Sequence, residues 1–335
     1  MKNTLPNEID IAVTTRIRLA RNIKSLPYPS KISFKDAQKL ICDVWCAFDN
    51  SPLKKSLKLY NMKEISDIEK KALVEKHLIS SELYASSVPS AAIISDDEKI
   101  SVMINEEDHL RIQVFEDGLE AEKAYDTAKK IEALLKEKLT FDYDEEFGHL
   151  TSCPTNIGTG LRASAMLHLP AINAAHRVNL LLKWASNLGM TVRGLYGESS
   201  KASGALFQFS NQITLGTSEK DIISRFSAAA CSLISEERRI LAELFQESPY
   251  ELRDKCLRSL GILKNAYMIS SSEAMNLVSN VCMASNAGII KNIDISALRR
   301  AMFKSMPAAI ILCSDSPMPK DRDVKRAQLL QQALE

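Results

Sequence analysis

Residues 91–118 read AAIISDDEKISVMINEEDHLRIQVFEDG, and this stretch decides the fold. Apolar or alternating runs at 91–95, 100–105 and 111–115 are joined by the polar connections DDEK and EEDH. This pattern is typical of consecutive antiparallel strands. A segment rich in Ala, Lys and Glu follows at 118–139 and predicts a helix. We therefore expect an α+β fold in which an antiparallel sheet is flanked by helices.

The segments before and after residues 91–139 are predicted to add further helices and strands. An extended segment is predicted at 9–19, and helices are predicted at 34–48 and 67–78. A polar segment at 142–160, DYDEEFGHLTSCPTNIGTG, has the Gly and Pro content of a loop. After it, the pattern predicts helices at 162–168 and 174–188, then strands at 190–196 and 205–215.

Strand signals almost vanish after Glu219. From there the chain has the pattern of successive helices, with breaks at 248–250, 268–273, 285–292 and 314–321. We therefore expect two domains: an α+β body over 1–245 and a smaller helical C-terminal domain over 246–335.

Charge and composition exclude several classes of function. The chain has 335 residues with 43 Lys and Arg against 42 Asp and Glu, so its formal net charge is +1. No bulk field is present to attract nucleic acid or an anionic membrane. The N-terminal segment carries Lys2, Glu8 and Asp10 and lacks the apolar core of a secretory signal. The apolar run at 308–313 is far too short to cross a bilayer.

The cysteines predict the compartment. There are seven, scattered along the chain, with no C-x-x-C pair. This pattern fits a reducing environment and argues against both a disulfide framework and a zinc ribbon. We expect a soluble, cytoplasmic protein.

Arginines are placed beside strands and loops in an unusual way. In VTTRIRLARN (13–22), Arg16 and Arg18 alternate with apolar residues, so on a strand both guanidiniums project from one face. A solvated strand edge with surface ion pairs is the alternative reading of such a pair. Arg111, Arg162 and Arg193 follow a polar connection, a Gly-rich loop and a strand-like run. Guanidinium groups match the oxygens of a triphosphate better than lysine does.

Carboxylates and one cysteine form two further candidates. Glu106, Glu107 and Asp108 crowd a short connection, and Glu198 ends RGLYGE; a polar turn is the alternative. Cys153 lies in the glycine-containing loop SCPTNIGTGLR, where nearby cations could stabilise a thiolate, although most cysteines are inert. The sequence contains no G-x-x-x-x-G-K-[ST] and no H-R-D, which excludes P-loop enzymes and ordinary protein kinases.

Four ordered strings resemble the phosphagen (guanidino) kinases. They are TTRIRLARN (14–22), NEEDHLRI (105–112), CPTNIGTGLRAS (153–164) and RGLYGE (193–198) with FQFSNQITLG (207–216). Within that family the chain is most similar to the bacterial protein-arginine kinases, because RGLYGE, EKHLIS (75–80) and RDVKRA (322–327) are features of that branch. The resemblance implies an antiparallel sheet flanked by helices, as the strand pattern does.

The resemblance also implies a site. Glu107 and Glu198 would grip and deprotonate the substrate guanidinium, with the Cys153 thiolate beside it. ATP would be bound with Mg²⁺ held mainly by phosphate and water, so no protein ligand is expected for the metal. The residues implied to contact ATP are Thr14, Thr15, Arg16, Ile17, Arg18, His77, Arg111, Arg162, Ala163, Ser164, Ala165, Met166, Arg193, Gly194, Leu195, Tyr196, Gly197 and Glu198. Those implied to read phosphoarginine allosterically are Arg322, Asp323, Arg326 and Ala327, for which a solvated basic helix end is the alternative.

The function implied is ATP-dependent phosphorylation of arginine side chains in proteins, marking them for a Clp-type protease or inactivating a stress-response repressor. A zinc-binding activator protein, a Clp chaperone or protease and a second copy in a homodimer are the implied partners; no nucleic acid or membrane is expected. Two alternatives stay open: a kinase of free arginine or another small guanidine, and a non-catalytic phosphoarginine-binding adaptor.

Overall fold

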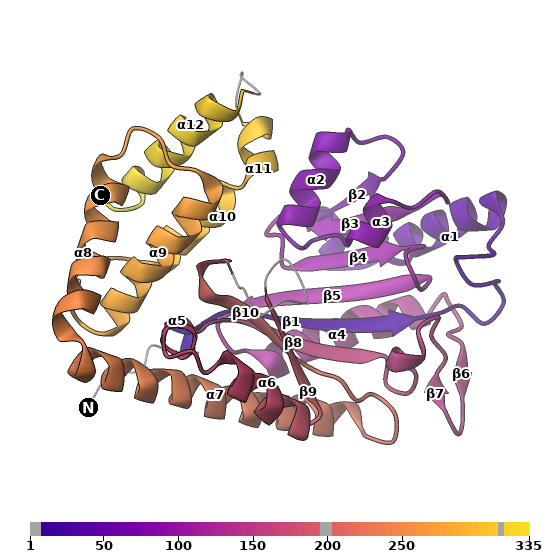
Figure 1. Ribbon diagram of the computed structural model, residues 1–335. Coiled ribbons are helices and arrows are strands. Elements are labelled where there is room, and N and C mark those ends of the chain that lie inside the picture. Colours follow the sequence, from indigo (N-terminus) through magenta and orange to yellow (C-terminus); the bar gives the residue numbers. More distant parts are fainter. Residues whose placement is uncertain (1–7, 195–202, 314–317) are drawn as a thin grey trace. The chain divides into compact units, whose positions relative to one another are not determined.

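The computed structural model describes residues 8–194, 203–313 and 318–335 (Figure 1). Its strands are β1 (Ala12–Arg21), β2 (Leu57–Asn61), β3 (Ala91–Ser95), β4 (Ile100–Ile104), β5 (Leu110–Asp117), β6 (Tyr143–Asp144), β7 (Gly148–His149), β8 (Leu161–His168), β9 (Met190–Gly194) and β10 (Leu206–Asn211). Its α-helices are α1 (Phe34–Ala47), α2 (Asp67–Glu75), α3 (Ser81–Tyr84), α4 (Ala121–Lys136), α5 (Pro170–Ala174), α6 (Val178–Asn187), α7 (Glu219–Glu247), α8 (Pro249–Asn265), α9 (Ser271–Asn286), α10 (Ile295–Lys304), α11 (Pro307–Leu312) and α12 (Pro319–Gln332). Short 3₁₀ turns are η2 (Pro52–Ser56), η3 (Pro154–Asn156) and η4 (Ser203–Ala205).

Eight strands form one sheet in the order β2-β3-β4-β5-β1-β8-β10-β9. Strands β2 to β5 pair antiparallel in sequence, with Ile93 opposite Val102 and Val102 opposite Ile112. Every residue of β3 and β4 is buried, which explains why these runs are apolar throughout and lack a clear alternation. The three predicted strands of residues 91–118 and the expected α+β class with an antiparallel sheet are confirmed.

Residues 162–168 were predicted to form a helix, and this prediction is wrong. The segment forms β8, which lies between β1 and β10 in the sheet. Ala163, Ala165 and Leu167 favour a helix by intrinsic propensity. In the folded chain, however, six of the eight residues of β8 are buried, so no alternation marks the strand and pairing in the sheet overrides propensity.

Other boundaries differ in smaller ways. The single helix predicted at 174–188 is two helices, α5 and α6, separated by a turn in which His176 has a φ of 56°. The polar segment 142–160 contains the β6–β7 hairpin and η3 within its loop. Strand β2 had no predicted counterpart. The break predicted at 248–250 is confirmed, because α7 ends at Glu247 and α8 begins at Pro249, where proline is well suited to a first helical turn.

The chain divides into two compact units, each described here by itself. The meander unit consists of Thr15–Ser164 and Ser210–Ser227, and the helical unit of Met1–Thr14, Ala165–Phe209 and Ala228–Glu335. The predicted domain boundary at 245/246 stays a prediction. None of the helices in the described ranges is both long and apolar enough to cross a membrane.

One face of the meander unit has a core that supports the site. Met62, Leu78, Leu83, Ala92 and Met103 are buried together, with further apolar residues packed around them. Helix α2 begins with a capping box in which Ser66 and Glu69 bond reciprocally, and Ser80 caps α3. These caps fix the loop at 76–80 against the sheet.

Candidate active site

Strand β1 presents two arginines on one face. Ile17 and Leu19 are 0% exposed, so the alternation directs Arg16 and Arg18 to the opposite face, as predicted. The Arg16 guanidinium lies 6.0 Å from the centre of the Phe115 ring, and its Nε is 3.4 Å from Ser164 Oγ. The Nε of Arg18 is buried and has no hydrogen-bond partner among the described residues.

Arg111, on β5, is held by two carboxylates. Its Nη1 donates to Glu106 Oε1 and its Nη2 to Glu107 Oε2, both at 2.8 Å. The Glu106 side chain is 0% exposed, whereas that of Glu107 is 39% exposed. The Ser80 hydroxyl also donates to Glu106. Glu106 is therefore a fixed anchor for Arg111, and Glu107 is the carboxylate that solvent or a substrate can reach.

The connection that carries these glutamates is rigid. Asn105 has a φ of 58°, and its amide donates to the carbonyls of Ala37 and Pro89. Asp108 is fully buried and accepts hydrogen bonds from Asn22 Nδ2 and the Ser152 backbone, both at 2.7 Å. These bonds set the backbone between β4 and β5 and so determine which glutamate points inward.

The arginines share a strongly positive environment. Burial, Arg111 and Arg162 lower the pKa of Arg16 to about 10. Burial and the charges of Arg16, Arg111 and Arg162 lower the pKa of Arg18 well below its ordinary value, and Glu106 opposes this shift. The positive charges of Arg16, Arg111 and Arg162 therefore act together on Arg18. Such a cluster can bind a multiply charged anion.

His77 completes this face of the meander unit. Burial, Arg16 and Arg18 lower its pKa to about 4, so the ring is neutral at pH 7. Its backbone has a φ of 59°, and its Nε2 has no hydrogen-bond partner within the described part of the chain. A neutral ring with a free nitrogen next to cations fits a contact with the uncharged part of an anionic ligand.

Two residues of β8 that follow Arg162 are fixed by hydrogen bonds. Ser164 is buried and donates to the Arg16 carbonyl at 3.2 Å. Ala163 N–H donates to Asn211 Oδ1 at 2.8 Å. Ala165 is buried and Met166 is half-buried. The Thr15 side chain also has a structural contact: its hydroxyl donates to Gly118 O at 2.6 Å and so fixes the segment before α4. The neighbouring Thr14 is half-buried.

Cys153 precedes η3 in a loop held close to its neighbours. Its Sγ is half-buried and lies 3.1 Å from Thr155 Oγ1. Gly158 has a φ of +109°, and a Cβ there would lie 2.4 Å from the Thr214 carbonyl. Gly160 has a φ of +59°, and a Cβ would lie 2.6 Å from the Ala20 carbonyl. Both positions therefore require glycine.

The remaining predicted ATP contacts lie outside the meander unit or outside the described residues. Arg193 is exposed and, with Gly194, ends β9 in the helical unit. Leu195, Tyr196, Gly197 and Glu198 lie outside the described residues, so the second predicted carboxylate has no structural description.

The motif RDVKRA lies on α12 in the helical unit. Arg326 is 2% exposed and donates to the carbonyls of Ser305 and Ile269 at 3.0 and 2.8 Å and to the Asp323 carboxylate. Arg322 and Asp323 are half-buried and Ala327 is buried. In this structure Arg326 joins α12 to two neighbouring segments.

Sequence reasoning missed the anchoring role of Glu106 and the contribution of Ser80. Both belong to motifs that were recognised, NEEDHLRI and EKHLIS. The letters alone do not show which of two adjacent glutamates is buried, because a turn, unlike a strand, has no fixed alternation.

Two family models match the chain. The one described as ATP:guanido phosphotransferase, C-terminal catalytic domain, matches residues 38–240, and the one described as Protein-arginine kinase McsB C-terminal domain matches residues 249–335. Full-length relatives are also similar. A protein-arginine kinase of Clostridium kluyveri is 43% identical over 326 residues, 97% of this chain and 94% of that protein. One of Clostridium acetobutylicum is 42% identical over 341 residues and covers 100% of both.

Solved structures share the fold at lower identity. A duplicated taurocyamine kinase of Schistosoma mansoni superposes with a TM-score of 0.63 at 22% identity, covering 73% of this chain and 36% of that one. A lombricine kinase superposes with a TM-score of 0.62 at 20% identity, covering 72% of this chain and 70% of that one.

Proposed function

Since the chain belongs to the ATP:guanido phosphotransferase family, we propose that it transfers the γ-phosphoryl group of ATP to arginine side chains of proteins. Its similarity to protein-arginine kinases over the whole chain supports a protein substrate. The observation that carries the proposal is the cluster of Arg16, Arg18, Arg111 and Arg162, in which burial and the charges of neighbouring arginines lower the pKa values of the first two.

The arginine cluster would bind the ATP phosphates. During phosphoryl transfer, negative charge spreads over the transferred group and the leaving diphosphate, and fixed guanidiniums stabilise it where it develops. His77 would contact the adenosine end, with backbone contacts from Thr14 to Ile17, from Ala163 to Met166 and from the segment 193–198. Mg²⁺ would supply further charge stabilisation; we propose that phosphate oxygens and water hold it.

Glu107 would act on the substrate. An arginine side chain has a pKa above about 12 and carries no nucleophilic lone pair when protonated. As the guanidinium nitrogen attacks the γ-phosphorus, its proton passes to a carboxylate, the bond from the γ-phosphorus to the β–γ bridging oxygen breaks, and ADP leaves. Glu107 already binds a guanidinium, that of Arg111, and it is the more exposed of the two glutamates. Glu198 would be its partner carboxylate, and the Cys153 thiolate would lie beside the substrate guanidinium.

The downstream role proposed is quality control. Phosphoarginine would mark proteins for a Clp-type protease or inactivate a stress-response repressor, and a zinc-binding activator would stimulate the kinase. Arg322, Asp323, Arg326 and Ala327 would read phosphoarginine in the C-terminal domain, 246–335, which would also form a homodimer. All seven cysteines lie among the described residues and are free, which supports a cytoplasmic location.

The experiment locates the phosphate. The purified protein is incubated with Mg-ATP and casein, and modified residues are mapped by mass spectrometry without acid, because the P–N bond is acid-labile. Phosphoarginine should form with the wild type and with Glu122→Gln, an exposed control, but not with Glu107→Gln.

Two other outcomes would overturn the proposal. ADP release with free arginine but no labelled protein would identify a small-guanidine kinase. Phosphoarginine binding with no phosphoryl transfer to any acceptor would identify an adaptor.

A further inference from the structure

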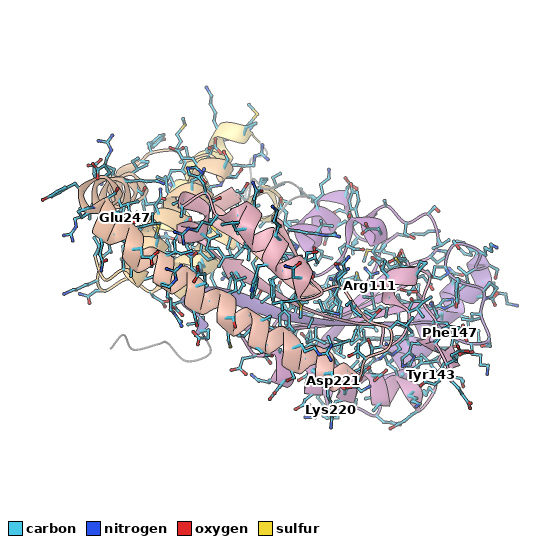
Figure 2. The ribbon with its side chains drawn as sticks, turned by 60° about the horizontal axis from the view of Figure 1, so that its bottom comes forward. Arg111, Tyr143, Phe147, Lys220, Asp221 and Glu247 are labelled. Atoms are coloured by element: carbon cyan, nitrogen blue, oxygen red, sulfur yellow. The ribbon has the colours of Figure 1, made fainter. Side chains whose placement is uncertain are left out.

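A pocket lies in the meander unit, around the β6–β7 hairpin. Its volume is about 360 Å³, and it is lined by the hairpin, by Gly158 and Thr159, and by residues 214–217 with Glu219. Figure 2 labels Tyr143 and Phe147 on this hairpin. Their exposures of 57% and 46%, with 50% for Leu215, are high for large hydrophobic side chains. The function proposed above does not use this pocket.

The pocket wall is firmly constructed. Asp144 Oδ1 accepts the backbone N–H groups of Glu146 and Phe147 at 2.8 and 2.9 Å, which fixes the hairpin turn. His149 and Gly158 exchange two backbone hydrogen bonds at 2.7 and 3.2 Å. The hairpin is thereby joined to the loop that carries Cys153. Because these hydrogen bonds hold the frame in place, binding there would cost little ordering entropy.

The charge of the pocket is negative. Glu145 and Glu146 line it and form no ion pair in the parts of the chain that the structure describes. Glu219 also lines it but is paired with Arg21 and Lys129. Among the described residues that line the pocket, none is Lys or Arg. Burial and Arg21 lower the pKa of His149 to about 4, so at neutral pH this ring adds no positive charge.

Two polar atoms of the lining residues lack partners. His149 Nδ1 and Thr217 Oγ1 are buried and form no hydrogen bond within the described ranges. Buried polar groups are normally satisfied, so these atoms are available to a polar group that enters the pocket. Exposed aromatic faces beside free carboxylates are a favourable environment for a cation, through cation–π attraction and ion pairing together.

We propose that this pocket docks a lysine or arginine side chain of an extended protein substrate, away from the arginine that is phosphorylated. The proposal rests on the proposed function, because it assigns the pocket to the same protein substrates. The shared loop 153–160 supports it: one end of that loop carries Cys153 and the other forms the pocket wall. A substrate segment would therefore be held at two points, and basic unfolded segments would be preferred.

The first test measures binding without catalysis. A fluorescent peptide carries three lysines and a citrulline in place of the target arginine, and its matched control carries acetyl-lysines. Wild-type protein and Glu122→Gln should bind the lysine peptide on the order of tenfold more tightly than the acetylated one. The double variant Glu145→Gln/Glu146→Gln should lose this preference, and Phe147→Leu should weaken it while the charges stay in place.

Several results would overturn the docking site. Equal binding of the two peptides would do so, and so would a preference that the double variant retains. A change in oligomeric state of the double variant on gel filtration would assign the surface to a second copy of the chain instead. Thermal unfolding of each variant checks that the exposed substitutions leave the fold intact.

A kinetic test separates this proposal from the function on which it rests. With peptides that contain one target arginine, the double variant should raise KM for the lysine-bearing peptide about tenfold and leave kcat unchanged. Phosphorylation with the same KM in both proteins would refute the docking site and leave the kinase function intact. A binding preference without any arginine phosphorylation would refute the kinase function and leave the docking site intact.

Discussion

The arginines on the two faces of strand β1 differ in how far their guanidinium groups are paired. On one face, Arg21 is 0% exposed, and its guanidinium reaches Glu132, Glu219 and the carbonyls of Ala20 and Thr159. On the other face, Arg18 has an unpartnered Nε within the described structure, and burial together with neighbouring cations lowers its pKa. Where a buried arginine has a structural role, as Arg21 does, carboxylates of the chain pair with it. We interpret the uncompensated Nε of Arg18 as a feature of the proposed ATP site.

The helical unit also contains a buried arginine whose donors are paired. Arg299 donates to the carbonyls of Ile9 and Asp10 and contacts His168. It resembles Arg21, since its donors are satisfied by the fold. A buried arginine is thus evidence of a ligand only where its donors or its charge remain uncompensated.

The same substitution on the two faces should give opposite results for stability, and the largest effect is expected at Arg21. Arg21→Met leaves Glu132 buried with weaker compensation and should lower the free energy of unfolding by about 3 kcal/mol. Urea unfolding followed by tryptophan fluorescence measures this. A Trp184→Phe background leaves Trp45, in the meander unit, as the reporter. An unchanged midpoint would mean that Arg21 is not a structural residue.

Arg18→Met should affect the reaction and spare the fold. Losing one preorganised guanidinium is expected to cost ~3 kcal/mol of transition-state stabilisation, about a hundredfold in kcat. Its free energy of unfolding should stay the same or rise, because a source of repulsion is removed. Steady-state kinetics with Mg-ATP and the same urea titration measure both. A destabilised protein with normal kcat would reverse the assignment of the two faces.

Substitutions of the two glutamates on the Arg18 face should likewise differ in whether they lower stability or activity. Glu106→Gln removes a buried charged partner of Arg111 and should cost about 2 kcal/mol of stability. Glu107→Gln, at a more exposed position, should cost less than ~1 kcal/mol of stability and abolish phosphorylation. Unfolding curves and turnover rates of both variants decide this. Equal stability losses would show that Glu106 is not the anchor.

A histidine near each face has a pKa that responds to the charges on that face. The smallest expected effect is a change in these pKa values. Burial lowers the pKa values of both His77 and His149 to about 4, with Arg16 and Arg18 acting on the first and Arg21 on the second. Arg18→Met should raise the pKa of His77 and leave that of His149 in place. Imidazole chemical shifts followed by NMR against pH measure both rings. A parallel shift of both would mean that the faces are not electrically separate.

These histidines also give the pH dependence of stability. Their folded pKa values lie below the ordinary value of about 6.5, so the unfolded chain takes up protons first as the pH falls. Stability is therefore full above about pH 6.5 and declines towards pH 4. His77→Gln should make this decline shallower.

The sequence predicted features whose physical cause is local. The alternation of Arg16 and Arg18 with Ile17 and Leu19 requires only the period of a strand, and it is found in β1. The helix predicted at 162–168 failed because burial on both faces of β8 depends on strands distant in the sequence. The anchoring role of Glu106 was not visible for a related reason: Ser80, which donates to it, belongs to another segment. The roles of all the predicted site residues, Glu198 and Cys153 included, remain predictions.

The cluster of Arg16, Arg18, Arg111 and Arg162 also has a consequence for the lifetime of the protein. A ligand that binds only the folded state adds about 2.7 kcal/mol of stability at one hundred times its Kd. With nucleotide between the guanidiniums, their repulsion becomes attraction to the phosphates. Depletion of ATP would therefore weaken the fold itself as well as stop the reaction. Heat sensitivity and susceptibility to proteolysis should then follow the energy charge of the cell.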